Sequence, residues 1–466
     1  MSTTAGTPEH PLRVAIVGSG PAGFYAAGQL LSAPDATVEV DLYDRLATPW
    51  GLVRAGVAPD HPKIKSVTRV YEKTAAKPGF RYVGNVEIGT DLSHDELAAA
   101  YHAVLYAVGA PTDRRLGIPG EDLPGSHAAT EFVAWYNGHP DYADREFDLT
   151  ARRAVVVGNG NVALDVARML ALTTEELAVT DTADHAIEAL RRSQVEEIVV
   201  LGRRGPAQAA YTNPELRELA ELVAADVIVD PAEVELDEHS RAFLASDAAD
   251  VTVRQNVEIV SGFARTPPAG KPKRVVLRFL ASPVEIYGSD RVEGVRVVRN
   301  EITPELRARP TGATEDIECQ LVLRSIGYRG TPIPGVPFDE ARATIHNTGG
   351  RVTREGTDEP VAGVYTAGWI KRGPSGVIGT NKKCAQETVT NLLADHAAGA
   401  LPEPSAAPDE LLAVLEERGV EVVDYAGWEL IDAHERGLGE PHGRPRVKLV
   451  RRAEHLLHAA AAKARG

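Results

Sequence analysis

An α/β protein is predicted, built from two units of strand, glycine-rich turn, helix and strand, with one unit placed inside the other. Residues 12–44 contain the apolar stretch "LRVAIV", the turn "GSGPAG" and a second apolar stretch, "TVEVDLYD". The same order returns from "RRAVVVGNGNVALDVARML" to "VEEIVVLGRRG", over residues 152–205. A further strand, turn and helix follow at 363–396. Apolar strands that alternate with helices predict parallel sheets buried on both faces.

The remaining segments are assigned in chain order. Residues 24–33 are predicted as the first helix, and residues 48–66, rich in Pro and Gly, as an irregular stretch. A short helix is expected at 66–76 and a buried strand at 103–110. Strand patterns then dominate from about 226 to 327, in "DVIVD", "RVVLRFL", "VEGVRVVRN" and "QLVLRSIG".

Composition limits the classes of function. The chain has 466 residues, 43% of them hydrophobic and 25% charged, which is ordinary for a globular protein of two or three domains. No apolar run approaches the roughly 18–20 residues of a membrane span. The first residues carry neither a signal-peptide nor a transit-peptide pattern, so the cytoplasm is the expected compartment. A net charge of −16 argues against general nucleic-acid binding.

Cysteine usage adds a second limit. The two cysteines, Cys319 and Cys384, form no C-x-x-C motif. This argues against a dithiol redox centre, a thiolate metal site or a disulfide framework, and no metal site is expected.

The first turn, with Gly18, Gly20 and Gly23, has the spacing of a dinucleotide-binding loop between a strand and a helix. Such a loop combines a tight turn, room for a pyrophosphate and close helix–strand packing, and the helix N-terminus faces the phosphates. Asp44, at the end of the next strand, can accept hydrogen bonds from ribose hydroxyls. An unphosphorylated ribose, as in FAD or NAD, is therefore expected here.

The second turn has Gly158 and Gly160 followed by Ala163, and its second strand ends in Arg203 and Arg204 instead of an acid. Arginines at a strand end are commonly solvated surface. At this tip, however, a guanidinium pair suits a 2′-phosphate, which a carboxylate would repel. The second site is therefore expected to prefer NADPH to NADH. Together the two sites suggest a flavin reduced by NADPH.

The segment "TAGWIKRGPSGVIGTN" lies where many flavoproteins with two dinucleotide folds carry a Gly-Asp pair for the flavin's ribityl chain. Here Trp369 follows Gly368, so that acid is absent. The backbone N–H groups of Gly376, Val377 and Ile378 lie near the start of a helix expected from about 380. A helix N-terminus aimed at a flavin would stabilise its anionic reduced ring. An apolar strand followed by a helix cap is the plainer alternative.

Long motifs in one order resemble the adrenodoxin reductase family of NADPH–ferredoxin reductases, most closely its bacterial members. These are "TPWGLVRAGVAPDHPKIK", "GNGNVALDVAR", "GRRGPAQAAYTNPELREL", "GWIKRGPSGVIGTNKK" and "GEPHGRPRVKL". The resemblance implies two Rossmann-like domains, with the NADPH-binding domain (113–324) inserted into the FAD-binding domain (1–112 and 325–466, with a C-terminal extension). It also implies noncovalent FAD and one-electron delivery to a separate iron–sulfur ferredoxin.

The resemblance also implies binding residues. For FAD they are Ala22, Asp44, Leu52, Val86, Trp369, Gly376, Val377 and Ile378. For NADPH they are Arg114, Asn159, Gly160, Asn161, Val162, Arg203, Arg204, Glu215 and Gly376. His61 and Glu215 match positions near the nicotinamide–flavin contact, where they would orient nicotinamide and carry protons. From the residues themselves, a histidine before proline is commonly structural, and Glu215 after Pro214 suits a helix's first turn.

Other functions remain open at this point: a flavin-dependent monooxygenase or other NADPH oxidoreductase, a disulfide reductase, and a nucleotide-binding sensor without turnover. An acidic ferredoxin would need a local basic face on this acidic protein. Candidate residues for it are Lys63, Lys65, Lys271, Lys273, Arg274, Arg296, Arg299, Lys371 and Arg372.

Overall fold

The computed structural model describes residues 5–463, with the side chain of residue 463 excepted, and the chain forms two compact units. Among the described residues, the first unit comprises 5–57, 61–112 and 328–463, and the second comprises 58–60 and 113–327. The chain crosses between the units on either side of residues 58–60 and at two short strands that pair with each other, β5 (Thr112–Asp113) and β15 (Tyr328–Arg329).

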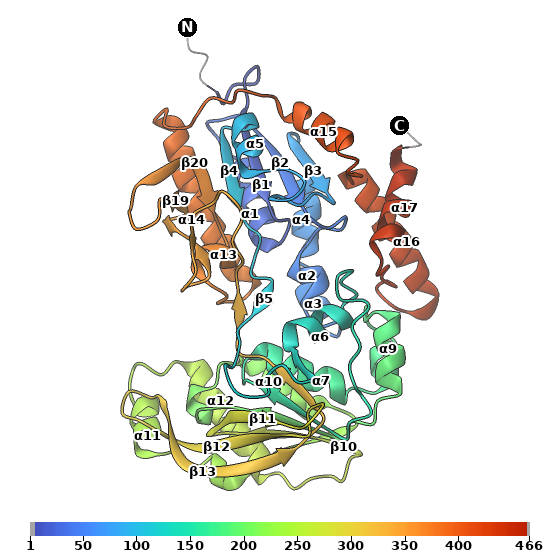
Figure 1. Ribbon diagram of the computed structural model, residues 1–466, viewed down its shortest axis with the longest axis vertical. Coiled ribbons are helices and arrows are strands. Elements are labelled where there is room, and N and C mark those ends of the chain that lie inside the picture. Colours follow the sequence, from blue (N-terminus) through green and yellow to red (C-terminus); the bar gives the residue numbers. More distant parts are fainter. Residues whose placement is uncertain (1–4, 464–466) are drawn as a thin grey trace. The chain divides into compact units, whose positions relative to one another are not determined.

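The first unit is built on a seven-stranded sheet in the order β18-β19-β20-β4-β1-β2-β3 (Figure 1). The strands are β1 (Leu12–Val17), β2 (Val38–Asp44), β3 (Phe80–Gly84), β4 (Ala103–Tyr106), β18 (Asn347–Thr348), β19 (Arg351–Thr353) and β20 (Pro360–Thr366). From β20 to β3 all neighbours are parallel. A small antiparallel pair, β16 (Phe338–Asp339) and β17 (Thr344–Ile345), is separate.

The helices of this unit connect and cover the strands. They are α1 (Pro21–Leu30), α2 (Leu52–Ala55), α3 (Pro62–Lys65), α4 (Thr68–Ala75), α5 (His94–Ala100), α13 (Trp369–Arg372), α14 (Ile378–Ala397), α15 (Pro408–Glu417), α16 (Tyr425–Gly439) and α17 (Arg452–Lys463). The 48–66 stretch, expected to be irregular, contains the two four-residue helices α2 and α3.

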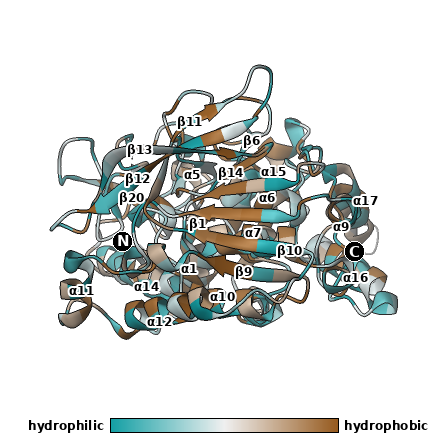
Figure 2. Cartoon of the chain, turned by 90° about the horizontal axis from the view of Figure 1, so that it is seen from below, coloured by the Kyte–Doolittle hydropathy of each residue, from teal (hydrophilic) through white to brown (hydrophobic). Residues whose placement is uncertain are grey.

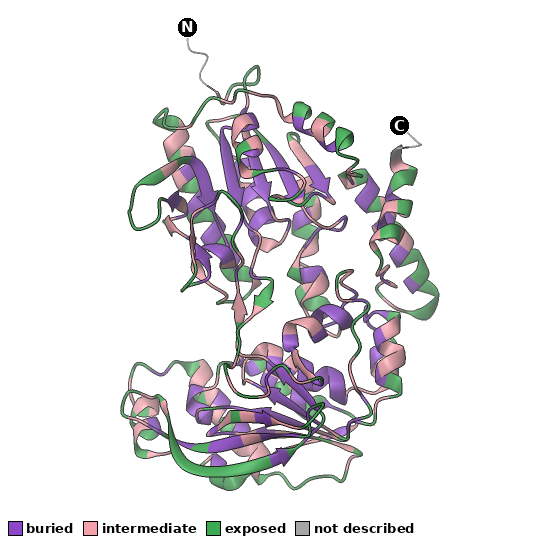
Figure 3. Ribbon diagram, viewed as in Figure 1, coloured by how far each residue is buried: buried purple, intermediate pink, exposed green. Residues whose placement is uncertain are grey.

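The central strands of the first unit are buried on both faces, as their unbroken apolar sequences predict (Figure 3). Leu12, Val14 and Ile16 contribute to a core on one face, while Ala15 and Val17 contribute to a second core on the other. The sheet is therefore an interior layer, with Asp41 of β2 as a buried polar exception.

The second unit has a six-stranded parallel sheet in the order β6-β14-β7-β8-β10-β9. The strands are β6 (Ser126–Ala128), β7 (Arg153–Val157), β8 (Glu197–Leu201), β9 (Ala225–Val229), β10 (Lys273–Arg278) and β14 (Leu321–Arg324). An antiparallel sheet of β11 (Ala281–Tyr287), β12 (Gly294–Ile302) and β13 (Ala308–Glu318) covers one face through a shared apolar core. Figure 2 shows β14 as largely hydrophobic, whereas β10 has hydrophilic ends around an apolar centre.

Helices connect the strands of the second unit. They are α6 (Ala129–Tyr136), α7 (Asn161–Ala171), α8 (Thr174–Leu177), α9 (Asp184–Arg191), α10 (Asn213–Glu218), α11 (Glu238–Ala245) and α12 (Val251–Arg265). The expectation that strands dominate from 226 to 327 misses α11 and α12. α12 buries Asn256 and Val260, and Ile259, Phe263 and Ala264 pack against the same core. These positions have the three- and four-residue spacing of a helix, which the expectation overlooked.

In each unit the strand order reverses at the strand that precedes the glycine turn. β1 lies between β2 and β4, and β7 lies between β8 and β14. Ligands of open α/β sheets bind outside the carboxyl ends of the strands at such reversal points. The topology therefore places one candidate site in each unit, at the turn after β1 and at the turn after β7. No helix of the described residues is long and apolar enough to cross a membrane.

Candidate dinucleotide sites

The turn after β1 is closely packed except at its second glycine. Gly18 has a φ of +107°, and a Cβ there would lie 2.5 Å from the Ala107 carbonyl oxygen. A Cβ on Gly23 would lie 2.0 Å from the Gly18 oxygen, so α1 sits directly on the turn. At Gly20 the nearest atom to such a Cβ, Gly51 Cα, is 4.0 Å away. The missing side chain at Gly20 therefore leaves the space that a pyrophosphate would take.

Asp44 ends β2 beside this turn, where the sequence predicted a ribose-binding acid. Its Oδ2 accepts hydrogen bonds from the Ser19 backbone N–H (2.9 Å) and from the Ser19 hydroxyl (2.5 Å), and its Oδ1 accepts one from Leu46 N–H (2.9 Å). A carboxylate can accept about four hydrogen bonds, so capacity for a ribose hydroxyl remains. Ser19, which is fully buried, was missed by the sequence reasoning because serine is unremarkable inside a glycine turn.

A pocket of about 430 Å³ opens at the same place. Its lining includes Gly18, Asp44, Val86, Val108 and Ile333, so the turn, the β2 tip and predicted residue Val86 are brought together. The lining also includes the charged residues Arg45 and Glu87, so apolar walls are combined with a few polar groups, as in many nucleotide pockets. The residues present thus fit the adenosine part of FAD.

The segment expected to face the flavin contains two glycines with positive φ angles, each just before a helix. Gly368, whose φ is +81°, precedes α13, and a Cβ on it would lie 2.8 Å from Ala22 Cβ of α1. Trp369 begins α13, and its Nε1 is buried without a hydrogen-bond partner among the described residues. Gly376 has a φ of +79° just before α14, which begins at Ile378, two residues earlier than expected.

The start of α14 is only partly available to a ligand. The Val377 N–H donates to Thr380 Oγ1 (3.2 Å) of the helix itself. The N–H groups of the first helical turn, beginning with Ile378, have no partner within the helix. Leu52, at the start of α2, is 39% exposed.

The turn after β7 repeats this pattern in the second unit. Gly158 has a φ of +129°, and a Cβ on it would lie 2.1 Å from the Ser325 oxygen. A Cβ on Gly160 would have no neighbour within 4 Å in the described part of the chain. The Asn159 Nδ2 is buried and has no hydrogen-bond acceptor among those residues. Open space at Gly160 and an unused donor at Asn159 fit a phosphate-bearing ligand.

Asn161 and Val162 begin α7 directly after this turn. The Asn161 side chain accepts a hydrogen bond from Thr212 N–H (2.8 Å) and thereby ties the turn to the start of α10.

Arg203 and Arg204 follow β8. Their backbone carbonyls accept hydrogen bonds, while their side chains have no partner among the described residues. Asn300 Nδ2 donates to the Arg203 carbonyl (2.7 Å), and Leu280 N–H donates to the Arg204 carbonyl (3.1 Å). Within residues 5–463 no carboxylate or carbonyl accepts from either guanidinium. Burial and the neighbouring Arg203 charge lower the pKa of Arg204. Two adjacent cations without an acid partner suit an anion, and the assignment to a 2′-phosphate stays a prediction.

The remaining predicted residues lie on loops and a helix start. Arg114 is exposed, with its side chain 3.6 Å from the position of a Cβ on Gly327. Glu215 lies in the first turn of α10 and accepts a hydrogen bond from the Thr212 hydroxyl, so it has the structural role that its position favours. His61 directly precedes α3, makes no side-chain capping hydrogen bond to it, and is only 8% exposed. His61 belongs to the first unit and Glu215 to the second.

The two cysteines are not a redox pair. Cys319 lies in the second unit and Cys384 in the first; both are buried free thiols. Burial raises the pKa of Cys319 to about 12, so this thiol is unreactive at neutral pH. The Cys384 sulfur accepts a hydrogen bond from Gly368 N–H (3.3 Å), which gives it a structural role.

Several residues considered for a basic face have partners. Arg274 pairs with Glu197, Arg296 with Glu285 and Asp316, and Lys371 with Glu387. The Lys273 ammonium donates to the Leu170 carbonyl (2.8 Å), and burial lowers its pKa. These cations are neutralised or withdrawn from the surface. Lys63 and Arg299 are exposed, without an ion pair in the described part of the chain.

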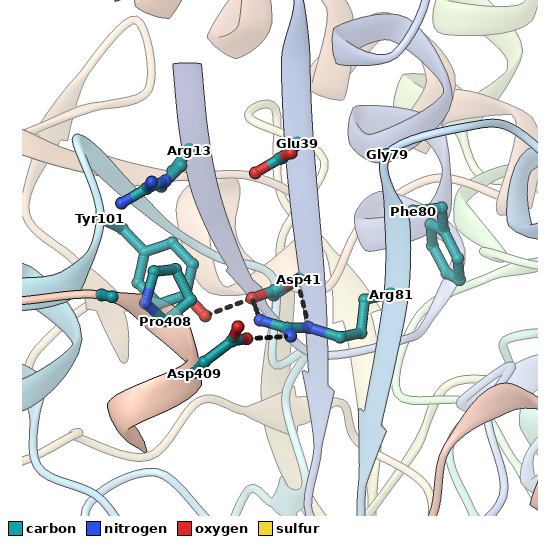
Figure 4. Close-up of a pocket in the computed structure, with 10 residues that line it drawn as sticks. Arg13, Glu39, Asp41, Gly79, Phe80, Arg81, Tyr101, Pro408 and Asp409 are labelled. Atoms are coloured by element: carbon teal, nitrogen blue, oxygen red, sulfur yellow. Dashed lines mark hydrogen bonds and ion pairs between the residues drawn. The ribbon is translucent and has the colours of Figure 1, made fainter. Parts of the chain in front are cut away.

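A second pocket of the first unit, of about 320 Å³, lies over the amino-terminal parts of β1, β2 and β3 (Figure 4). Asp41 accepts from Arg81 Nε (2.9 Å) and Nη2 (2.5 Å) and from the Tyr101 hydroxyl (2.5 Å). Arg81 also pairs with Asp409 of α15 (2.6 Å). These groups satisfy one another and tie α15 to the sheet, away from the glycine turn at the other end of β1.

The comparisons with known proteins agree with this geometry. Residues 12–200 match the family model described as pyridine nucleotide-disulphide oxidoreductase. The chain is 51% identical to the NADPH-ferredoxin reductase FprA of Mycobacterium leprae, with 96% of this chain and 98% of that protein covered. It is 41% identical to the mitochondrial NADPH:adrenodoxin oxidoreductase of Arabidopsis thaliana, covering 97% and 96%. The solved structure of Mycobacterium tuberculosis FprA in complex with NADPH is 48% identical, with a TM-score of 0.90 and coverage of 97% and 100%.

Each unit has a run of parallel strands with a glycine turn at its reversal point, and with these comparisons the chain is an oxidoreductase that binds FAD and a pyridine nucleotide. The class predicted from the sequence is confirmed. At this identity and coverage, the chain belongs to the adrenodoxin reductase-type family of NADPH–ferredoxin reductases.

Proposed function

We propose that this protein takes reducing equivalents from NADPH and passes electrons singly to a separate iron–sulfur ferredoxin. The observation that carries the proposal is the contrast between the two strand tips. Asp44 follows the first turn and suits an unphosphorylated ribose, whereas unpaired Arg203 and Arg204 follow the second and suit a 2′-phosphate. FprA proteins and the plant relative carry names of the same activity.

In this proposal the first unit binds FAD and the second unit binds NADPH. FAD, when bound, accepts a hydride and gives up its electrons one at a time. Gly20 and Gly160 leave room for the two pyrophosphates, and Asn159 donates to a phosphate. The first turn of α14 would present N–H groups to the flavin, and Trp369 and Leu52 are further proposed contacts. The other proposed contacts are Ala22, Val86, Arg114, Asn161, Val162, Gly376 and Val377.

His61 and Glu215 are proposed to hold nicotinamide in place and to move protons. An imidazole can accept a proton and return it as the reduced cofactor is oxidised. Glu215 has a structural partner in Thr212, so its catalytic role requires a test that separates the two functions.

The ferredoxin is proposed to dock on a basic and apolar surface of the first unit, here called the α3–α4 surface: Lys63, Ile64, Arg69, Val70 and Lys73. Its three cations are exposed and have no ion pair within the described residues. Ile64 is 40% exposed and Val70 is 47% exposed. Unpaired cations attract an acidic partner, and exposed apolar side chains give close contact. The compartment, expected to be the cytoplasm, stays a prediction.

The decisive experiment starts from the purified protein. We expect a yellow protein whose flavin absorbance bleaches with NADPH and which reduces cytochrome c only when ferredoxin is added. Rapid peroxide formation with an organic substrate would instead indicate a monooxygenase, and a colourless protein would indicate a nucleotide-binding sensor.

A further inference from the structure

The loop at residues 48–56 packs directly on the first glycine turn. Trp50 N–H donates to the Ser19 carbonyl (3.0 Å). A Cβ on Gly51 would lie only 2.9 Å from Gly20 Cα, so the two backbones touch at the glycine that leaves room for a pyrophosphate. Any displacement of this loop therefore changes the shape of that space.

Trp50 holds the loop in a conformation that is unfavourable for its residue type. Its φ is +85°, a left-handed value that costs free energy for a bulky side chain. The ring is 3% exposed, and its Nε1 has no hydrogen-bond partner in the described part of the chain. Trp428 packs edge-on against it with ring centroids 4.8 Å apart, and the Arg446 guanidinium lies 5.5 Å from its centroid. Surrounding contacts must therefore hold this loop in place.

An ion cluster joins the same loop to α16. Arg54 of α2 makes a two-pronged pair with Glu435, through Nη1 (2.8 Å) and Nη2 (2.6 Å). Arg446 Nη1 (3.1 Å) and Leu449 N–H (2.9 Å) donate to the same carboxylate. Glu435 is completely buried and Arg54 is 8% exposed. Burial would raise the pKa of Glu435, but the Arg54 and Arg446 charges outweigh it and hold the pKa at about 2.

Residues 424–463, here called the C-terminal brace, thus support a loop almost four hundred residues earlier in the chain. Lys448 Nζ adds a hydrogen bond to the Arg54 carbonyl (3.1 Å). The brace contains α16 and α17, which lie outside the parallel sheet (Figure 1). No residue of the brace was predicted to bind a nucleotide.

We propose that Glu435 is a positioning residue for FAD: through Arg54 and Arg446 it holds the 48–56 loop against Gly20, so that the space for the pyrophosphate is formed before the cofactor binds. This inference rests on the proposed binding of FAD in the first unit. Glu435 reaches the flavin site only through the loop, because its carboxylate is fully occupied by donors from this chain.

The test measures FAD affinity of the full-length protein, by the fluorescence of FAD that is released and rebound. Glu435→Gln keeps the shape and removes the charge, and it should raise the Kd for FAD at least roughly tenfold. Arg54→Lys keeps the charge but loses the two-pronged geometry, whereas Arg54→Met loses both. We expect the lysine variant to bind FAD more tightly than the methionine variant, and the visible circular dichroism of bound flavin to change in Glu435→Gln.

Asp395→Asn is the matched control. Asp395 of α14 also makes a two-pronged pair in the first unit, with Arg351 (2.7 and 2.8 Å), but it does not touch the 48–56 loop. The inference is overturned if Glu435→Gln keeps wild-type FAD affinity, or if Asp395→Asn weakens FAD equally at a similar loss of thermal stability. If Glu435→Gln does not fold, equal FAD affinity in Arg54→Lys and Arg54→Met overturns it. A wild-type protein that holds no FAD would instead refute the proposed function.

Discussion

The side chains of Arg203 and Arg204 should determine which pyridine nucleotide the protein uses. Each charge-assisted hydrogen bond to a 2′-phosphate contributes about 1.5–3 kcal/mol. Replacing both by alanine should therefore lower kcat/KM for NADPH by roughly 10²–10³-fold, after allowance for non-additivity. Activity with NADH and the FAD content should stay unchanged, since neither involves that phosphate. An unaltered preference for NADPH in steady-state kinetics would contradict the assignment.

Gly20 and Gly160, the second glycine of each turn, should distinguish the two sites. A side chain at Gly160 would enter open space, so Gly160→Val should fold, retain its yellow colour and fail to bind NADPH. Gly20→Val would occupy the space beside Gly51 and should give a colourless protein. Absorbance at purification and NADPH binding measure both outcomes. Loss of flavin from Gly160→Val would mean that the two sites had been assigned the wrong way round.

His61→Ala and Glu215→Ala should each slow flavin bleaching by NADPH in stopped flow, by roughly 10²-fold if the side chain positions or transfers a proton. For Glu215 the control is Thr212→Val, which removes the hydroxyl that bonds Glu215 but keeps the carboxylate. Equal slowing in Thr212→Val and Glu215→Ala would show that Glu215 acts through its bond to Thr212 and has a structural role. Wild-type bleaching in His61→Ala would show that His61 has no catalytic role.

At the scale of elements, the C-terminal brace should make the first unit sensitive to acid. Burial, with the nearby Arg54 charge, lowers the pKa of His455 to about 4, from an ordinary value of 6.5. As the pH falls below about 6.5, the unfolded chain therefore binds the proton before the folded one. Stability is complete above that pH and declines between about 6.5 and 4, by at most ~3 kcal/mol.

Thermal unfolding of the FAD-loaded protein between pH 7.5 and 4.5 measures this effect. His455→Gln cannot bind the proton, yet its amide can still donate to the Leu449 carbonyl that His455 Nε2 contacts (3.0 Å). This variant should lose less stability than the wild type over the same interval. Glu435, whose pKa is also lowered, adds its own loss only below about pH 4.5, because its ordinary pKa is 4.5. Parallel curves for the two proteins would exclude His455 as the cause.

At the scale of the whole molecule, a net charge of −16 would repel an acidic ferredoxin without a local cationic surface. Steering by such a surface can raise association rates by roughly 10–10³-fold and is screened by salt over about 8–10 Å. Ferredoxin reduction should therefore slow steeply from low to moderate salt, while ferricyanide reduction changes little. Lys63→Glu combined with Arg69→Glu and Lys73→Glu should slow ferredoxin reduction at low salt and flatten this dependence.

Arg299→Glu is the comparison variant, because Arg299 is an exposed cation of the second unit without an ion pair among the described residues. A larger effect of Arg299→Glu than of the triple variant would move the docking surface away from α3 and α4. A salt-independent reaction in the wild type would remove electrostatic docking altogether, although the flavin chemistry would be unaffected.

Local sequence was sufficient to predict the two glycine turns, the residues at the two strand tips and the α/β class. Glycine spacing, Asp44 and the Arg203–Arg204 pair lie within a few residues of the strands that position them, so their chemistry can be inferred from adjacent residues. Helices α11 and α12 were not recognised among the neighbouring strand patterns. In α12, Val253, Val257, Val260 and Ala264 recur at helical spacing, so the local sequence did carry a signal for this helix.

The packing around the first site involves segments that are far apart in the sequence, so local patterns could not predict it. Arg54 and Glu435 are separated by 381 positions, and no periodicity links them. Their pairing depends on where α16 packs. The same holds for the contact of Gly51 with Gly20 and for the acids that neutralise Arg274 and Arg296. The type of a residue determines which interactions it can make, but the tertiary structure determines which partners lie within reach.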